Sequence, residues 1–93
     1  MQYFGTGRIG LTQNVAYTGT AGTITNVISP SVQKVRILCT TDAFVKIDNS
    51  PTATNADAYV VGLEPEYFTC TPGQKVSAVQ VSAGGTLYVT EVG

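Results

Sequence analysis

The glycines at positions 5, 7 and 10 have the spacing of a nucleotide-binding loop. The stretch "GTGRIG" reads G-x-G-x-x-G, a pattern that brings backbone N–H groups close to a pyrophosphate. That chemistry needs a strand before the loop, a helix after it and an acidic residue about 20 positions later. Here only "MQYF" precedes the glycines, and the first acidic residue is Asp42. We therefore expect no nucleotide or other cofactor.

Other residue types that support catalysis or metal binding are sparse. The chain has no histidine, which excludes Ser-His-Asp and Cys-His sites. Glu64 and Glu66 flank Pro65 and could form a pair of catalytic carboxylates, but we interpret them as a solvated turn. Cys39 and Cys70 are not in a C-x-x-C pattern, and we expect small buried hydrophobes rather than a disulfide or metal pair. We therefore predict no catalytic residue, no metal site and no enzymatic activity.

Charge is sparse along the whole chain. Hydrophobic residues make up 43% of it and charged residues 12%, with five basic and six acidic side chains scattered singly, so neither disorder nor a phosphate-binding face is expected. No apolar run approaches the roughly 18 residues that cross a bilayer, and the first residues lack a secretory signal. We expect synthesis in a cytoplasm and no nucleic-acid or membrane partner. A threonine-rich surface of low charge suits contact with protein.

Periodicity predicts strands in almost every part of the chain. Short segments rich in Val, Ile, Thr and aromatic residues are found at 14–18, 22–28, 34–40, 43–48, 58–63, 66–71, 75–82 and 85–92. No window keeps an apolar 3.6-residue repeat for three turns, so no sizeable helix is expected. The pattern predicts an all-β fold: a single β-sandwich, jelly-roll-like, of seven or eight short antiparallel strands, with a small barrel as the alternative.

Turn residues divide these segments. "TTD" at 40–42 predicts a tight hairpin between Cys39 and Phe44, because Asp tolerates the conformations of short loops. "TPGQ" at 71–74 has Pro and Gly in the positions of a type II turn, and "AGG" at 83–85 gives the next reversal. The long polar connection at 48–58 is expected to be a surface loop, in which Pro51 excludes a central strand.

Alternation along the strands predicts which side chains face the core. The expected inward residues are Val35, Ile37, Cys39, Val45 and Ile47, with Arg36 exposed. On the last strand Leu87 and Val89 share one face, and Tyr88, Thr90 and Val92 share the other. Both faces of that strand are partly apolar, so it is expected to be covered on both sides.

The first quarter of the chain differs in composition from the rest. Glycines alternate there with threonines and aromatic residues. The glycines allow the backbone to bend in ways that other residues seldom adopt, and the aromatic side chains can pack against another surface. We expect residues 1–22 to be either an irregular first strand or an arm that lies along a neighbouring subunit, and residues 23–93 to be the body of the sandwich. Within such an arm the candidate interface anchors are Tyr3, Phe4, Arg8 and Tyr17.

The segment from residue 35 to 92 resembles a known group of proteins. "VRILCTTDAFVKI", then "PTAT", then "PEYFTCTPGQKVSAVQVSAGGTLYVTEV" is similar to small virion structural proteins of tailed bacteriophages, which resemble capsid decoration, or cement, proteins. The resemblance rests on turns and core positions and does not include the first third of the chain. None of its residues is a catalytic or ligand-binding signature.

The resemblance implies a jelly-roll-like structural protein on the outside of an icosahedral head. It would bind the major capsid protein in many copies, associate with copies of itself as a dimer or trimer, and bridge capsomers. The alternative is a carbohydrate-binding or host-recognition module of a tail fibre or spike, in which Tyr59, Tyr67 and Tyr88 would stack on sugar rings.

Overall fold

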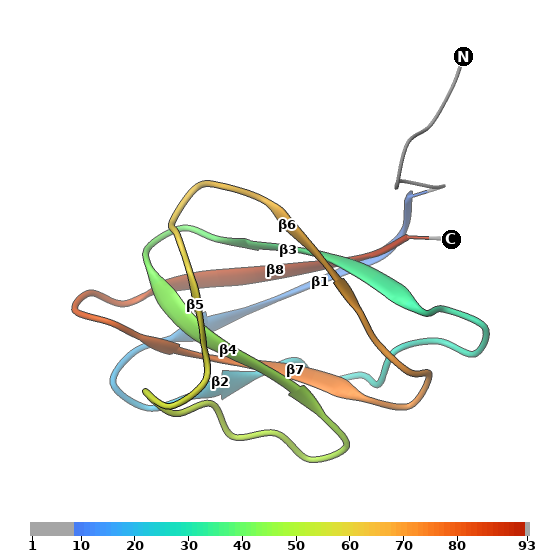
Figure 1. Ribbon diagram of the computed structural model, residues 1–93, viewed down its shortest axis with the longest axis horizontal. Helices are drawn as coiled ribbons and strands as arrows, with labels where there is room; N and C mark the ends of the chain where they lie inside the picture. Colours follow the sequence, from blue (N-terminus) through green and yellow to red (C-terminus); the bar gives the residue numbers. More distant parts are fainter. Residues whose placement is uncertain (1–8, 93) are drawn as a thin grey trace.

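The computed structural model describes residues 9–92, which form an all-β domain (Figure 1). Its strands are β1 (Ile9–Tyr17), β2 (Gly22–Thr23), β3 (Lys34–Cys39), β4 (Ala43–Asp48), β5 (Ala58–Val60), β6 (Glu66–Thr69), β7 (Lys75–Gln80) and β8 (Gly85–Val92). Residues 9–92 contain no helix, and so no helix in this range could cross a membrane.

The strands form two four-stranded sheets. Sheet A has the order β1-β8-β3-β6 and sheet B the order β2-β7-β4-β5, and every pairing is antiparallel. The first strand pairs with the eighth, the second with the seventh, the third with the sixth and the fourth with the fifth. This arrangement is a long hairpin wound into two sheets, which is the jelly roll. The predicted fold is therefore confirmed.

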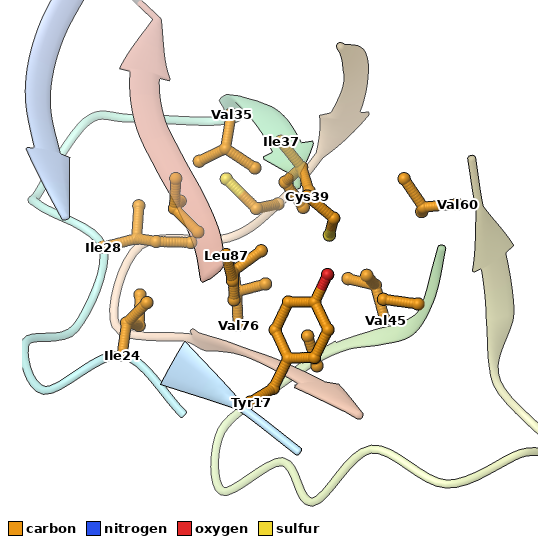
Figure 2. Close-up of a cluster of buried hydrophobic side chains, with 14 residues drawn as sticks. Tyr17, Ile24, Ile28, Val35, Ile37, Cys39, Val45, Val60, Val76 and Leu87 are labelled. Carbon is orange, nitrogen blue, oxygen red and sulfur yellow. The ribbon is translucent and has the colours of Figure 1, made fainter. Parts of the chain in front are cut away.

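The core lies between the two sheets and follows the predicted alternation. Val35, Ile37 and Cys39 are fully buried, Val45 is buried, and Ile47 is partly buried against them. Figure 2 shows side chains from both sheets meeting in this cluster. On β8, Leu87 and Val89 are buried from one face and Thr90 and Val92 from the other. The expectation of a strand covered on both faces holds only at its end: Thr90 and Val92 are buried, whereas Thr86 and Tyr88 on the same face stay partly exposed.

The predicted hairpin at 40–42 is wrong. β3 belongs to sheet A and β4 to sheet B, so the chain crosses from one sheet to the other between Cys39 and Ala43. A short polar turn with Asp can close a hairpin within one sheet or carry the chain from one sheet to the other. Local sequence does not distinguish these two arrangements. The type II turn at 71–74 is present: Gly73 has a φ of 89°, and the Gln74 N–H donates to the Thr71 carbonyl oxygen (3.2 Å).

The long connection between β4 and β5 covers part of the outer face of sheet B. Pro51 and Ala53 are buried, and the Ala53 N–H donates to the Ser77 hydroxyl on β7 (3.0 Å). The Thr23 hydroxyl on β2 donates to the Pro51 carbonyl oxygen (3.3 Å). Ser77 is fully buried as a result, although it lies on the outer side of its sheet.

Residues 40–42, here called the 40–42 segment, connect the loops at one end of the sandwich (left in Figure 1). The Thr41 hydroxyl donates to the Ala83 carbonyl oxygen (3.0 Å), and the Asp42 carbonyl oxygen accepts the Val81 N–H (3.3 Å). The Asp42 carboxylate accepts the Gly62 N–H (2.7 Å). The loops that follow β5 and β7 are therefore both hydrogen-bonded to this segment.

Tyr17 connects the 40–42 segment to the core. Its ring is 1% exposed, and Figure 2 shows the hydroxyl pointing toward Cys39. The hydroxyl accepts the Thr41 N–H (3.1 Å) and donates to the Thr41 carbonyl oxygen (2.7 Å). A buried phenol normally finds such partners. Tyr17 is the last residue of β1, and β1 pairs with β8 over most of its length. Residues 9–17 are therefore part of the sandwich.

Replacing Tyr17 by Phe is expected to lower the free energy of unfolding by about 1–3 kcal/mol, because the Thr41 N–H would lose its partner in a largely buried place. The matched control is Tyr88→Phe, on the outer face of sheet A, for which we expect a change below about 0.5 kcal/mol. Urea denaturation followed by circular dichroism measures both values. Equal losses in the two variants would contradict the role assigned to the Tyr17 hydroxyl.

Candidate protein-binding surface

The outer face of sheet A, here called face A, is formed by the side chains that alternate with the buried ones. Tyr88 on β8 is opposite Leu38 on β3, and Arg36 on β3 is opposite Thr90 on one side and Tyr67 on the other. The remaining outward positions are Thr12, Asn14 and Ala16 on β1, Thr86 and Val92 on β8, Lys34 on β3 and Thr69 on β6.

Face A combines apolar and aromatic residues with little charge. Leu38, Arg36 and Tyr88 are half-exposed, and Tyr67 is 45% exposed. Lys34 and Arg36 are its only charged side chains among residues 9–92, and no carboxylate lies on it. Tyrosine and arginine are enriched in protein interfaces, whereas acidic residues are depleted. Face A therefore has the composition of a protein-binding surface.

The outer face of sheet B differs from face A in charge and in cover. It carries Lys46 and Asp48 from β4 and Lys75 from β7, with Asp48 opposite Lys75, and the loop containing Pro51 and Ala53 covers part of it. Its apolar row consists of Phe44, opposite Tyr59 on one side and Val79 on the other. The two sheets are therefore not equivalent, and face A is the more open of the two.

A second exposed apolar feature is the connection between β5 and β6, residues 61–65, here called the 61–65 tip. Leu63 is 72% exposed and Val61 44% exposed. Leu63 has a φ of 64°, the left-handed region that leucine seldom adopts. Its N–H donates to the Cys39 carbonyl oxygen (2.7 Å). A Cβ on Gly62 would lie 2.8 Å from the backbone of Thr41, so only glycine fits there.

Asp42 holds the 61–65 tip in place. Its carboxylate accepts the Tyr59 hydroxyl (2.6 Å) and the Gly62 N–H (2.7 Å). Both hydrogen bonds lower the pKa of Asp42, and the bond from Tyr59 has the larger effect. The hydrogen bond between Tyr59 and Asp42 also raises the pKa of Tyr59. The Tyr59 ring also meets Phe44 edge-on, with centroids 5.5 Å apart. The tip therefore presents Leu63 from a fixed backbone.

Replacing Leu63 by Gly is expected to raise the free energy of unfolding by up to about 1 kcal/mol. The left-handed conformation costs an L-residue about 1–2 kcal/mol, and glycine avoids this cost. The greater flexibility of glycine in the unfolded chain offsets about 0.5–1 kcal/mol of the stability gained. The β-branched variant Leu63→Val is expected to lose about 1 kcal/mol instead. Chemical denaturation compares the two variants. A loss for Leu63→Gly as large as that for Leu63→Val would contradict the strain inferred here.

The sequence-predicted interface residues have different positions. Tyr3, Phe4 and Arg8 lie outside the described residues. Tyr17 lies in the core with its hydroxyl bonded to Thr41, so the prediction that it anchors a neighbouring subunit is corrected: the ring is used inside its own domain.

The three tyrosines considered for sugar stacking do not lie on one surface. Tyr67 and Tyr88 share face A, on strands separated by β3. Tyr59 lies on the outer side of sheet B, opposite Phe44. The sequence patterns considered above do not mark Leu38 or Leu63 as surface residues. The alternation on β3 could have identified Leu38, but no sequence signal marks a leucine with positive φ.

The two cysteines are free thiols and are both buried. Burial raises the pKa of Cys39 from 9.0 to about 11, against the opposing hydrogen bond with Tyr17. Burial, and to a smaller degree the charge of Glu91, raises the pKa of Cys70. Neither thiol is a nucleophile at neutral pH. Within residues 9–92 no three Cys, Asp or Glu side chains gather as metal ligands.

The raised pKa of Cys39 predicts a loss of stability in alkali. The native state holds the thiol proton more tightly than the unfolded state, so this contribution is complete below about pH 9 and is lost as the pH rises through about 11. The decline of unfolding free energy across this window should be shallower in Cys39→Val. Denaturant titrations at several pH values measure both slopes. Identical slopes would show that Cys39 does not titrate there.

Comparison of the chain with protein-family models, with curated proteins and with solved structures finds no match.

Proposed function

We propose that this protein is a non-enzymatic structural component of a tailed-phage virion, which binds the outer capsid surface in many copies and bridges capsomers. The resemblance of residues 35–92 to capsid decoration proteins supports the class. The observation that carries the proposal is face A, an open sheet surface with tyrosines, a leucine and an arginine and without a carboxylate among residues 9–92.

The physical requirements of capsid stabilisation fit such a surface. A head that holds packed DNA places outward stress on the joints between capsomers, and a small domain attached on both sides of a joint must be released before the joint opens. One standard contact buries about 800 Å² per partner, and linked contacts reinforce each other through effective concentration. Apolar and aromatic contacts also keep their strength in salt better than exposed ion pairs do.

The buried, protonated thiols agree with a passive role. Cys39 and Cys70 lie inside the sandwich, where they contribute to packing. The hydrogen bonds of the 40–42 segment hold loops together. The proposed work of the domain is therefore to present rigid surfaces, with face A toward the capsid.

Purified virions test the assignment directly. We expect the protein on the outside of the head in a copy number that follows the symmetry of the shell, as measured by quantitative gel analysis and cryo-electron microscopy. A few copies per particle located on the tail would favour the alternative host-recognition role, which binding to a glycan array would support. Absence from the particle would overturn the proposal.

A matched pair of variants tests whether face A makes the contact. Tyr67→Ala, on face A, is expected to weaken binding to heads that lack the protein by about 30-fold, the effect of one interface hot spot. Tyr59→Ala is the control, since Tyr59 is similarly exposed (50% against 45%) but lies on sheet B. Co-sedimentation with heads measures both affinities. A loss confined to Tyr59→Ala would place the contact on the other sheet.

A further inference from the structure

We propose that the outer edge of β1 is a self-association site, at which β1 pairs antiparallel with β1 of a second copy. Each sheet has two edge strands, and β1 is the longest of the four at nine residues, against two for β2, three for β5 and four for β6. β1 contains no charged residue and no proline. Short length, charge, proline and bulges are the usual means of protecting an edge. β1 has only the last of these, a register shift between Ile9 and Thr12, and the strand is regular from Thr12 to Tyr17.

The outward backbone groups of β1 can be identified from its neighbours. A Cβ on Gly22 would lie 2.1 Å from the Ala16 carbonyl oxygen, so that oxygen points away from β8. Backbone direction alternates along an antiparallel strand, and Asn14 and Thr12 therefore also point their N–H and C=O groups to the outer edge. These groups have no backbone partner among residues 9–92.

The free groups define one register for the pairing. With Gln13 on the twofold axis, Thr12 of each copy is opposite Asn14 of the other, and each such pair exchanges both of its N–H···O bonds. Ala16 is excluded from the pairing because Gly22 covers its carbonyl oxygen. Leu11, 67% exposed, lies directly before this pairing, in the irregular stretch between Ile9 and Thr12.

The chemistry beside the edge favours a second copy as the occupant. A twofold axis places the strand against an identical strand, and a strip without charge meets no like charge there. β1 is such a strip, and so is the adjoining segment 24–28, which Gln13 holds through two hydrogen bonds to the Asn26 backbone (3.0 and 2.9 Å). Val27 in that segment is 49% exposed. Leu11 and Val27 thus add exposed apolar surface beside the unpaired backbone.

Pairing at this edge would join the two A sheets into one continuous sheet. Face A of each copy would then lie on the same side, and a dimer would present twice the binding surface of a monomer. The pairing itself does not depend on the proposed function. Its consequence, that one dimer contacts two neighbouring capsomers, rests on that function.

The experiment is sedimentation-velocity analysis of the purified full chain over a range of concentrations, with amide hydrogen exchange followed by NMR. We expect a dimer, with the Thr12 and Asn14 amides protected to a degree that rises with concentration. Asn14→Pro removes an outward donor without removing a bond to β8, and it should weaken dimerisation about tenfold or more.

The matched control is Thr69→Pro in β6, the other edge of sheet A. The Cys70 N–H donates to Gln33 on the β3 side (2.9 Å), so the Thr69 N–H points outward, as that of Asn14 does. This variant should leave the dimer intact. A monomer at every concentration, rapid exchange of Thr12 and Asn14 in a wild-type dimer, or a dimer broken by Thr69→Pro but not by Asn14→Pro would each overturn the proposal. None of these results depends on binding to a virion.

Discussion

The hydrogen bonds of Thr40, Thr41 and Asp42 hold one end of the jelly roll together. Where a chain crosses from one sheet to the other, its backbone groups leave the β ladder and need other partners. Here the 40–42 segment is bonded to Tyr17, to the 61–65 tip and to the loop after β7. The core beneath it stays closed because these partners belong to both sheets. The position of Leu63 and the burial of Tyr17 both follow from this arrangement.

The outer faces of the two sheets differ in composition and in how residues 9–92 cover them. The loop after β4 lies over sheet B and buries Ser77. Face A keeps Tyr67 exposed and Tyr88 half-exposed. The proposed capsid-binding role would make use of this asymmetry, since face A offers aromatic side chains for contact. The proposed pairing of β1 edges would enlarge that open face and give partners to the backbone groups of Thr12 and Asn14 that have none within residues 9–92.

Local sequence predicted most of the strands, the type II turn at Gly73 and the inward direction of Val35, Ile37 and Cys39, because alternation and turn chemistry depend on neighbouring residues. It failed at 40–42, where the same turn residues serve a hairpin or a crossing between sheets. It also failed at Tyr17: an aromatic residue in a glycine-rich segment has the composition of an arm, yet its ring fills the core and its hydroxyl bonds to Thr41.

The sequence by itself determined the fold class and the absence of histidine-dependent sites, since strand periodicity and the lack of histidine are properties of the chain read in order. Only the tertiary structure decided which sheet face stays open, which strand edge has no backbone partner within residues 9–92 and where Leu63 is held. Those features arise when residues far apart in the chain meet, as Thr41 meets Ala83 and Gly22 meets Ala16. Such contacts depend on sheet order, which no local pattern of side chains specifies.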